Sequence, residues 1–440
     1  MKCINCGTDN NLKDRTANNG RCKQCNHPFV FEPTTMGNVK ITDPMFVKIL
    51  ADISANNTLY FSSKQLLYFL DGRLRKKAFQ PLGFAVGYIF FNIWVTGFFG
   101  GLTAFIPNSF IFANLIYQAA TIFYLFKNTT SSKLNNTNRK ASARTLQILG
   151  IVILVVGILV SLSFNSFPLF TTVVLLGMSS IYLGTKQLGI VKSLPQEFLV
   201  NQSYLDGWLE NWQAINGNIE YILPSPQEQL TPASINPDVT AYSFDRLVVC
   251  DSAKVAQILI ANNFHFENNC AILSVNGYPE NIFATTMEML RRNPNLQVFA
   301  FHDCTPKGIT LAHRLSSSDT WFLNHNVRIM DLGLLPRQIL ASKRGMFVQK
   351  SDFLAQKSQQ LPLEVRQNIL PEELAWLDAG NFVELESFTP KMLIKILQGG
   401  ISQTMSLVND DSSLFVINDH GLSVVDDDSI NSVYIVETFG

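Results

Sequence analysis

The sequence predicts a multi-domain membrane protein with a zinc-ribbon head, a bundle of four transmembrane helices and a carboxy-terminal α/β domain on a parallel sheet. Three observations predict this fold class. Two Cys-x-x-Cys pairs lie near the amino terminus, and four long runs almost without charge follow within residues 80–187. After residue 243 the chain alternates short apolar strands with helices. Charge-free length and hydrophobic period are the primary sequence signals for such elements.

We divide the chain into a zinc ribbon, a small helical juxtamembrane unit, a transmembrane bundle, a linker with an amphipathic helix, an α/β domain and an acidic α+β extension. Their ranges are 1–32, 40–79, 80–187, 188–242, 243–345 and 346–440. The net charge is zero, but residues 1–192 hold 19 Lys and Arg against 6 Asp and Glu, while residues 193–440 hold 15 against 28. The basic half suits an anionic membrane surface, whereas lipid and nucleic acid phosphates would repel the acidic half.

The first segment contains two matched cysteine pairs. Cys3 and Cys6 are separated by two residues, fifteen residues follow, and Cys22 and Cys25 repeat the spacing. Each pair fits a turn that directs two thiolates at one metal ion, and four thiolates complete a tetrahedral structural zinc site. Disulfide pairing is the alternative, which a cytosolic location disfavours. The spacing leaves open whether such a ribbon binds nucleic acid, protein or neither.

Residues 42–77 predict two short helices. The first starts at Asp43-Pro44, and Ser62 or Ser63 can cap the second. This pattern is compatible with a small helix-turn-helix or winged-helix unit. A simple helical hairpin beside the membrane is the alternative.

Four apolar runs follow, each close to the ~20 residues that a helix needs to cross ~30 Å of hydrocarbon. They are Leu82–Ile106, Phe110–Phe126, Leu146–Phe164 and Phe167–Gly184. The alternative, four successive buried core helices, is disfavoured by the near absence of polar interruptions. Lys and Arg flank the block and its central loop, while the two other connections are uncharged. The positive-inside rule therefore predicts a multi-pass protein of the plasma (inner) membrane with both termini in the cytoplasm.

No Asp, Glu, Lys, Arg or His lies within the four runs. Pumps and transporters use such groups, so we expect an anchor or an oligomerisation bundle rather than a conduit. Gly97, Gly100 and Gly101 would permit close helix packing, and a homo-oligomer formed through the transmembrane helices fits the sequence. In the linker, Leu205, Trp208, Leu209 and Trp212 form a helical stripe. We expect this stripe to pack against the following domain rather than to lie at the bilayer surface.

The α/β domain contains four predicted strands separated by helices, which is typical of a doubly wound parallel sheet. They are Arg246–Asp251, Cys270–Gly277, Leu296–Asp303 and Val327–Gly333. Sites in such sheets form at the carboxyl ends of the strands. Asp251, Glu280 and Asp303 lie at or just after those ends.

The succession VVCDS, ILSVNGYPE, FAFHDCTPKG and MDLGLLPRQI resembles the Toprim domain, most closely that of type IIB topoisomerase A subunits and related meiotic DNA-breaking proteins. It covers residues 243–340 and extends weakly to 379–388 (AGNFVELESF). The resemblance implies Mg²⁺ held by a Glu after the first strand and by Asp-x-Asp after the third. Asp251 stands for that Glu, Asp303 keeps the first Asp and Thr305 replaces the second. Such losses weaken a Mg²⁺ site unless Glu280 or Asp331 compensates.

The same family carries a DNA-cleaving Tyr upstream, in a segment like Thr-x-Arg-x-x-x-Tyr. The stretch SSKQLLY can be laid on this motif with Tyr68 at the nucleophile position and a Lys in place of the Arg. A buried core tyrosine is the alternative.

Three functions follow as expectations. The first is a membrane-anchored cytosolic Toprim-like protein that binds a protein partner or nucleic acid at the inner face of the membrane without catalysis. The second is a Mg²⁺-dependent nuclease or topoisomerase-like enzyme acting on DNA, with Asp251, Asp303, Glu280 and Tyr68 as its candidate catalytic residues. The third is a membrane scaffold that recruits proteins through the zinc ribbon.

Overall fold

The computed structural model describes residues 1–409 with gaps at 37–38, 76–80, 103–108, 132–133, 135, 191–194, 227–243, 292, 294, 324, 326 and 342–345. The chain forms two compact units. The first, which we call the α/β unit, comprises Met1–Asp71, Phe198–Ala341 and the chain from Gln349 onward. The second, which we call the helical unit, comprises Gly72–Glu197 and Ser342–Val348. The last part of the predicted acidic extension, residues 410–440, lies outside the described residues.

The amino-terminal part of the α/β unit contains α1 (Leu12–Ala17), α2 (Asp43–Ile53) and α3 (Ser63–Arg75). The two helices predicted within 42–77 are thus present as α2 and α3. Thr42 caps α2, because its side chain accepts a hydrogen bond from the N–H of Met45. Ser62 caps α3 in a reciprocal arrangement, in which Oγ of Ser62 accepts from the N–H of Gln65 and the N–H of Ser62 donates to Gln65 Oε1, both at 3.1 Å.

An aromatic cluster joins the end of the cysteine-rich head to α2 and to α8 (Gln202–Asn216). The rings of Phe31 and Phe46 lie 5.1 Å apart, and Trp212 lies 6.0 Å from Phe31 and 4.9 Å from Phe46. The expected partner of the α8 stripe was therefore wrong, because Trp212 contacts the preceding head. An apolar stripe specifies that a helix face is buried, but its period carries no information about which element covers it.

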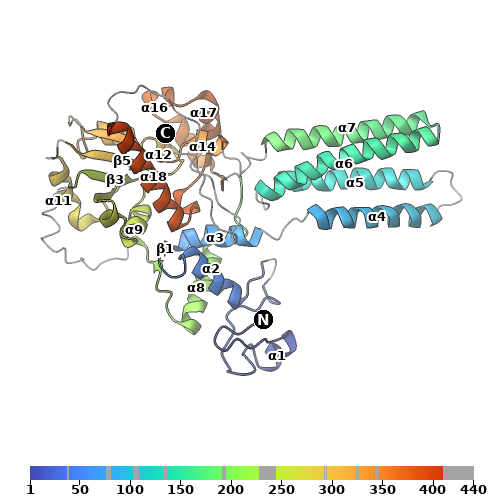
Figure 1. Ribbon diagram of the computed structural model, residues 1–440, viewed down its shortest axis with the longest axis horizontal. Coiled ribbons are helices and arrows are strands. Elements are labelled where there is room, and N and C mark those ends of the chain that lie inside the picture. The colour runs from blue at the N-terminus through green and yellow to red at the C-terminus, as the bar shows by residue number, and fades with distance from the viewer. Residues whose placement is uncertain are drawn as a thin grey trace. The chain divides into compact units, whose positions relative to one another are not determined.

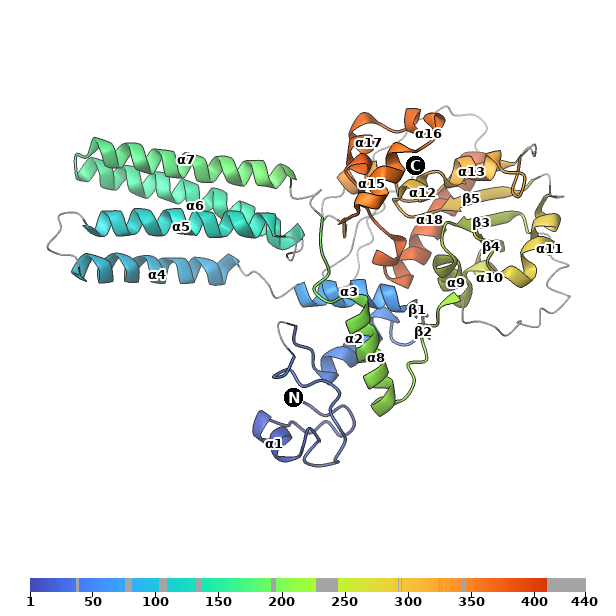
Figure 2. The same cartoon turned by 180° about the vertical axis from the view of Figure 1, so that it is seen from behind.

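A four-stranded parallel sheet forms the centre of the α/β unit (Figure 2). Its strands are β3 (Arg246–Cys250), β4 (Cys270–Ser274), β5 (Gln297–Phe301) and β6 (Arg328–Asp331), in the order β4-β3-β5-β6. All three pairs are parallel, as the strand and helix alternation predicted. The carboxyl ends of β3 and β5 therefore lie side by side at one edge.

Helices connect and cover these strands. They are α9 (Ala253–Ala261), α10 (Phe264–Glu267), α11 (Glu280–Arg291), α12 (Pro306–Ile309), α13 (Leu311–Ser317) and α14 (Pro336–Ala341). Leu247, Val249 and the other residues of the same strand parity pack with Met287 of α11 and Leu315 of α13. Residues of the opposite parity, such as Val248 and Cys250, are fully buried too. Both faces of the sheet are covered, which explains why its strands are continuous apolar runs.

The carboxy-terminal segment returns to the edge of the sheet. It comprises β7 (Gln349–Lys350), α15 (Asp352–Gln359), α16 (Leu363–Gln367), α17 (Pro371–Asp378), β8 (Asn381–Phe382), the 3₁₀ helix η4 (Leu385–Ser387) and α18 (Pro390–Asn409). Strands β7 and β8 pair antiparallel. A backbone bridge between Cys304 and Val383 joins the segment to the residues that follow β5.

The helical unit contains α4 (Pro81–Leu102), α5 (Ser109–Thr130), α6 (Asn136–Ser163) and α7 (Phe167–Ile190), which lie side by side in Figure 1. Within the described residues, α5, α6 and α7 are long and apolar enough to cross a membrane. The described apolar stretch of α4 is shorter, at Gly83–Phe99. The unit is consistent with membrane association.

Glycines bring α6 and α7 into close contact. A Cβ added at Gly150 would lie 2.8 Å from the backbone oxygen of Gly177, and one added at Gly184 would lie 2.9 Å from that of Ala143. Small residues let membrane helices approach in this way. Gly97 and Gly101 pack against no other helix within this chain, because a Cβ at either position would meet nothing within 4 Å, and the side chain of Gly100 lies outside the described residues. Close packing of these glycines against another copy of the chain stays a prediction.

We predict that Gly150→Leu destabilises the helical unit by about 1–3 kcal/mol, because the added side chain forces two backbones apart. The measurement is thermal unfolding of the full-length protein in detergent. Gly97→Leu is the matched control, because its new side chain enters open space on α4. Equal losses of thermal stability in the two variants would contradict the proposed close contact between α6 and α7.

Candidate functional site

The four cysteines of the head form a compact donor set. Their sulfur atoms all lie within 4.8 Å of one another, with Cys3 Sγ 3.6 Å from Cys25 Sγ and Cys6 Sγ 3.6 Å from Cys22 Sγ. A zinc tetrahedron with Zn–S bonds of ~2.3 Å has S–S edges of roughly 3.8 Å. A disulfide requires ~2.05 Å, and all four thiols are free. The donor set therefore fits a structural metal ion such as zinc.

Two equivalent backbone turns present these thiolates. The N–H of Gly7 donates to Cys3 O at 2.9 Å, and the N–H of Asn26 donates to Cys22 O at 3.0 Å. Gly7 and Asn26 each follow the second cysteine of a pair and have left-handed backbone, with φ of 75° and 57°. Glycine and asparagine are the residues that adopt this conformation at least cost.

Asn10 is a buried polar residue that links the two turns. Its Nδ2 donates to Cys22 Sγ at 3.4 Å, and its Oδ1 accepts from the N–H of Lys23 at 2.9 Å. Hydrogen bonds from the backbone N–H of Cys25 and from Asn10 lower the pKa of Cys22 to about 6. The Cys-x-x-Cys spacing gives no signal for Asn10, because its role comes from the way the two turns face each other.

An acidic group of a different kind lies at the carboxyl edge of the sheet. Asp251 follows β3 and Asp303 follows β5, and the N–H of Asp303 donates to Asp251 Oδ2 at 3.0 Å. Asp303 Oδ1 in turn accepts from the N–H of Leu385 at 2.6 Å. Asp251 is 6% exposed, and its Oδ1 has no hydrogen-bond partner among the described residues. Two of the predicted site residues are thus adjacent.

The contact with Leu385 brings Glu384 and Glu386 to the same edge, where they meet α3 and its cap. Lys64 Nζ lies 2.6 Å from Glu384 Oε1, and the Tyr68 hydroxyl donates to Glu384 Oε2 at 2.6 Å. Ser62 Oγ donates to Glu386 Oε1 at 2.8 Å. Tyr68, the proposed nucleophile of the resemblance, therefore lies in this cluster, although it is only 5% exposed.

Burial and mutual repulsion set the protonation of the cluster. Burial, together with the charge of Asp251, raises the pKa of Asp303 well above its usual range, and burial raises the pKa of Asp251. Burial and then Glu384 raise the pKa of Tyr68, so the phenol stays protonated at neutral pH. Burial alone would lower the pKa of Lys64, but Glu384 outweighs it and raises that pKa.

The other predicted residues, Glu280, Asp331 and Thr305, either lie outside this cluster or make hydrogen bonds that stabilise the fold. Glu280 is exposed at the start of α11, and none of the hydrogen bonds described connects it with Asp251 or Asp303. Asp331 Oδ1 is 3.0 Å from His302 Nε2 and accepts from the N–H of Gly333 at 2.8 Å. Thr305 caps α12 by accepting from the N–H of Gly308. Among the described residues, only the four cysteines form a set of three or more metal donors within 4.8 Å.

Glu384, Glu386 and Lys64 were not predicted as site residues. The sequence did contain a signal for the two glutamates, because they interrupt an apolar stretch, FVELESF, at a spacing of two. In an extended segment this spacing puts both side chains on one face. Lys64 stands at the Arg position of the motif on which SSKQLLY was laid, but the sequence did not indicate its partner, which lies 320 residues further along the chain.

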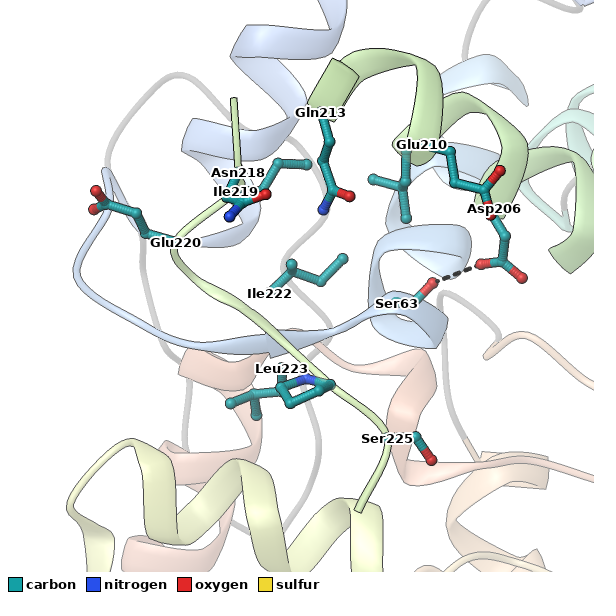
Figure 3. Close-up of a pocket in the computed structure, with 12 residues that line it drawn as sticks. Ser63, Asp206, Glu210, Gln213, Asn218, Ile219, Glu220, Ile222, Leu223 and Ser225 are labelled. Atoms are coloured by element: carbon teal, nitrogen blue, oxygen red, sulfur yellow. Dashed lines mark hydrogen bonds between the residues drawn. The ribbon is translucent and has the colours of Figure 1, made fainter. Parts of the chain in front are cut away.

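A separate open groove lies between α3, α8 and β2 (Ile222–Leu223), as Figure 3 shows. Asp206, Glu210 and Glu220 line it, and Ser63 Oγ donates to Asp206 Oδ1 at 3.2 Å. None of the residues predicted as catalytic or metal-binding lines this groove. It is a shallow acidic surface.

Comparison with protein-family models finds no model that matches the chain, and comparison with curated proteins finds no match either. The fold, the four-cysteine centre and the acidic edge of the sheet are therefore the basis for describing this protein. The described part of the chain combines a four-cysteine centre that fits zinc, three helices able to cross a membrane and an α/β unit with a parallel sheet.

We predict that Asn10→Leu weakens zinc binding roughly 10- to 100-fold, as expected for the loss of a hydrogen bond to a ligand. The measurement is competition with a chromophoric chelator in reducing buffer. Asn5→Leu is the matched control, because Asn5 lies between Cys3 and Cys6 with an exposed side chain. The same loss in both variants would show that Asn10 has no specific part in holding the metal ion.

We also predict that Asp303→Asn stabilises the protein at neutral pH by about 1 kcal/mol or more, because it removes a carboxyl group that burial makes costly to ionise in the folded state. A carboxyl group whose pKa is higher in the folded than in the unfolded protein lowers the free energy of unfolding as pH rises. This loss is absent below the unfolded-state pKa of ~3.9 and is complete above the folded-state pKa. The unfolding temperature of the native protein should therefore rise as pH falls from neutral toward ~4, and this rise should shrink in Asp303→Asn. The exposed Asp319→Asn is the control. An unchanged pH profile in Asp303→Asn would contradict the prediction.

Proposed function

We propose that this chain is a membrane-anchored cytosolic protein with four spans, whose Toprim-like α/β unit binds a partner at the inner face of the membrane without catalysis. The observation that supports a non-catalytic role is that the acidic edge is bound by side chains of the same chain. Glu384 is bound by both Lys64 and Tyr68 at 2.6 Å. The carboxylate closest to the proposed nucleophile is therefore already paired within the chain.

The four-span topology is supported by α4 and by the flanking charges. Helix α4 runs for 22 residues without Asp, Glu, Lys, Arg or His, which corresponds to ~33 Å at 1.5 Å per residue. Lys and Arg flank the block on the side assigned to the cytoplasm. Polar contacts also join α4 to α5, with Asn114 Nδ2 2.8 Å from Thr96 Oγ1. Such contacts stabilise helix pairs in membranes.

The Mg²⁺ ion that the Toprim resemblance implies does not fit the donor set. A hard divalent cation requires several oxygen ligands with negative charge. Thr305 has no carboxylate and its hydroxyl is used as a helix cap, while Glu280 is exposed at the start of α11. Among the described residues, the four cysteines are the group of three or more His, Cys, Asp or Glu side chains placed to hold a metal ion, and the carboxylates of the edge form no such group. This argues for a degenerate site and for a binding role.

The DNA-cleaving alternative is favoured by one observation, which is that Tyr68 and Asp303 belong to the same cluster. Two segments of the resemblance that lie far apart in the sequence are thereby linked through Glu384 and Leu385. The raised pKa of Tyr68 counts against this alternative, because a protonated and buried phenol is a weak nucleophile. A scaffold that recruits proteins through the zinc-binding head is the third proposal, supported by the closed four-thiolate set.

We predict that the purified full-length protein in detergent does not nick supercoiled plasmid in the presence of Mg²⁺ or Mn²⁺. The measurement is plasmid relaxation on gels, together with trapping of any DNA joined covalently to protein. Tyr68→Phe and Asp303→Asn are assayed beside the native chain. Metal-dependent nicking that both substitutions abolish would overturn the non-catalytic proposal and establish the DNA-cleaving alternative.

A further inference from the structure

His302 is a fully buried histidine that directly follows β5. Its Nδ1 lies 2.8 Å from the backbone oxygen of Asp303, and its Nε2 lies 3.0 Å from Asp331 Oδ1. A carbonyl oxygen and a carboxylate oxygen only accept hydrogen bonds, whereas a neutral imidazole has one N–H donor and one acceptor nitrogen. A neutral His302 would therefore satisfy only one of these two contacts.

Two glycines leave the slot in which the imidazole ring lies. A Cβ added at Gly333 would lie 2.2 Å from ring atoms of His302, and one added at Gly308 would lie 3.1 Å from its Nδ1. The backbone beside the ring is fixed as well, because the N–H of Leu334 donates to the carbonyl oxygen of His302 at 2.9 Å. The N–H of Gly333 donates to Asp331 Oδ1 at 2.8 Å, which fixes the carboxylate. The ring is thus held in one orientation, with each nitrogen facing an oxygen.

The charges that face His302 favour a positively charged ring. Burial alone would lower the pKa of His302, but the carboxylate of Asp331 outweighs it and raises that pKa, and the charge of Asp251 acts in the same direction. Burial alone would raise the pKa of Asp331, but His302 outweighs it and lowers that pKa. Two cations act on these carboxylates from further away, namely Lys307 on Asp251 and Arg337 on Asp331.

We propose that His302 carries a proton on both ring nitrogens and forms, with the carboxylate of Asp331, a pH-sensitive link between the carboxyl ends of β5 and β6. The charged ring donates to both oxygens, so it holds the backbone of Asp303 in place. When one proton is lost, a nitrogen lone pair faces one of the two oxygens, and the closely packed glycines leave the ring no room to turn away. Raising the pH therefore weakens the hold on Asp303 at the acidic edge. The inference is independent of which proposed function is right.

The first test is the protonation state of His302 in the full-length protein in detergent, measured by nitrogen NMR with isotope-labelled histidine. An imidazolium gives two ring nitrogens of the protonated kind, whereas a neutral ring gives one protonated and one unprotonated nitrogen. A histidine with an unperturbed pKa of ~6.5 is about nine-tenths neutral at a pH of ~7.5. We expect His302 to show two protonated nitrogens at that pH, and His302→Gln assigns its signals by their absence.

Asp331→Asn tests the partner of the link. The substitution removes the carboxylate and keeps the size of the side chain, and the new amide can donate to an unprotonated Nε2. A neutral His302 then satisfies both contacts, so we expect one of its two protonated-nitrogen signals to be lost at the same pH. His313→Gln is the matched control, because His313 forms a pair of the same kind with Glu364, at 2.7 Å, on the exposed surface. This control should leave the signals of His302 unchanged.

Thermal unfolding measures the link itself. A histidine whose pKa is higher in the folded protein contributes stability that is complete below its unfolded-state pKa of ~6.5 and is lost as pH rises through the folded-state pKa. The unfolding temperature of the native protein should therefore fall as pH rises above ~6.5, and this fall should be smaller in Asp331→Asn. His313→Gln should follow the native profile.

Three outcomes would overturn the proposal. One is a native chain in which His302 has an unprotonated nitrogen at a pH of ~7.5, since the ring would then be neutral in the folded protein. Another is an Asp331→Asn protein in which His302 keeps two protonated nitrogens. The third is an unfolding temperature that depends on pH equally in Asp331→Asn and the native chain. If Asp331→Asn does not fold, the native chain decides, because the loss of the second proton from His302 must coincide with the fall of its unfolding temperature.

Discussion

The backbone N–H of Leu385 donates a 2.6 Å hydrogen bond to Asp303, and the backbone N–H of Asp303 donates to Asp251. This short chain of bonds connects β3, β5 and the carboxy-terminal segment. The bridge between Cys304 and Val383 fixes the same junction from the backbone side. Leu385 lies between Glu384 and Glu386, so its hydrogen bond to Asp303 also determines the positions of the two glutamate side chains. The contacts of α3 with the sheet edge depend on that arrangement.

Two adjacent carboxyl groups at the buried ends of parallel strands are costly for stability. Among the described residues, no Lys, Arg or His nitrogen lies within 4.0 Å of a carboxylate oxygen of Asp251 or Asp303, and burial favours the neutral forms of both groups. A core optimised for stability alone would hold apolar residues there, as it does at Val248 and Phe299. Positions that break local rules in this way concentrate at sites that bind or react. The acidic edge is therefore the best candidate for a binding or reaction site in the α/β unit. Lys64 offsets the negative charge of Glu384 there.

The strands, the cysteine centre and the two helices before the helical unit could be predicted, because each depends on residues close together in the sequence. The features that could not be predicted depend on pairings between distant segments. Trp212 packs on Phe31, and Lys64 meets Glu384, through contacts that no local period encodes. The close contact of Gly150 with α7 could not be predicted for a related reason. Gly97 and Gly150 look alike in sequence, and only the position of α7 shows that Gly150 lies against another helix of this chain.

The helical unit enters the chain between Asp71 and Phe198, and the two ends of this insertion meet within the α/β unit. The N–H of Leu199 donates to Asp71 Oδ1 at 2.7 Å, and the rings of Tyr68 and Phe198 lie 4.9 Å apart. Insertions are tolerated where the ends of the inserted segment are close, because the host core is then left intact. The α/β unit can therefore carry the inserted helical unit without breaking the contact of Tyr68 with Glu384. Helix α3 belongs to both units, because its first turns contact Glu384 and its last residues, from Gly72, belong to the inserted helical unit.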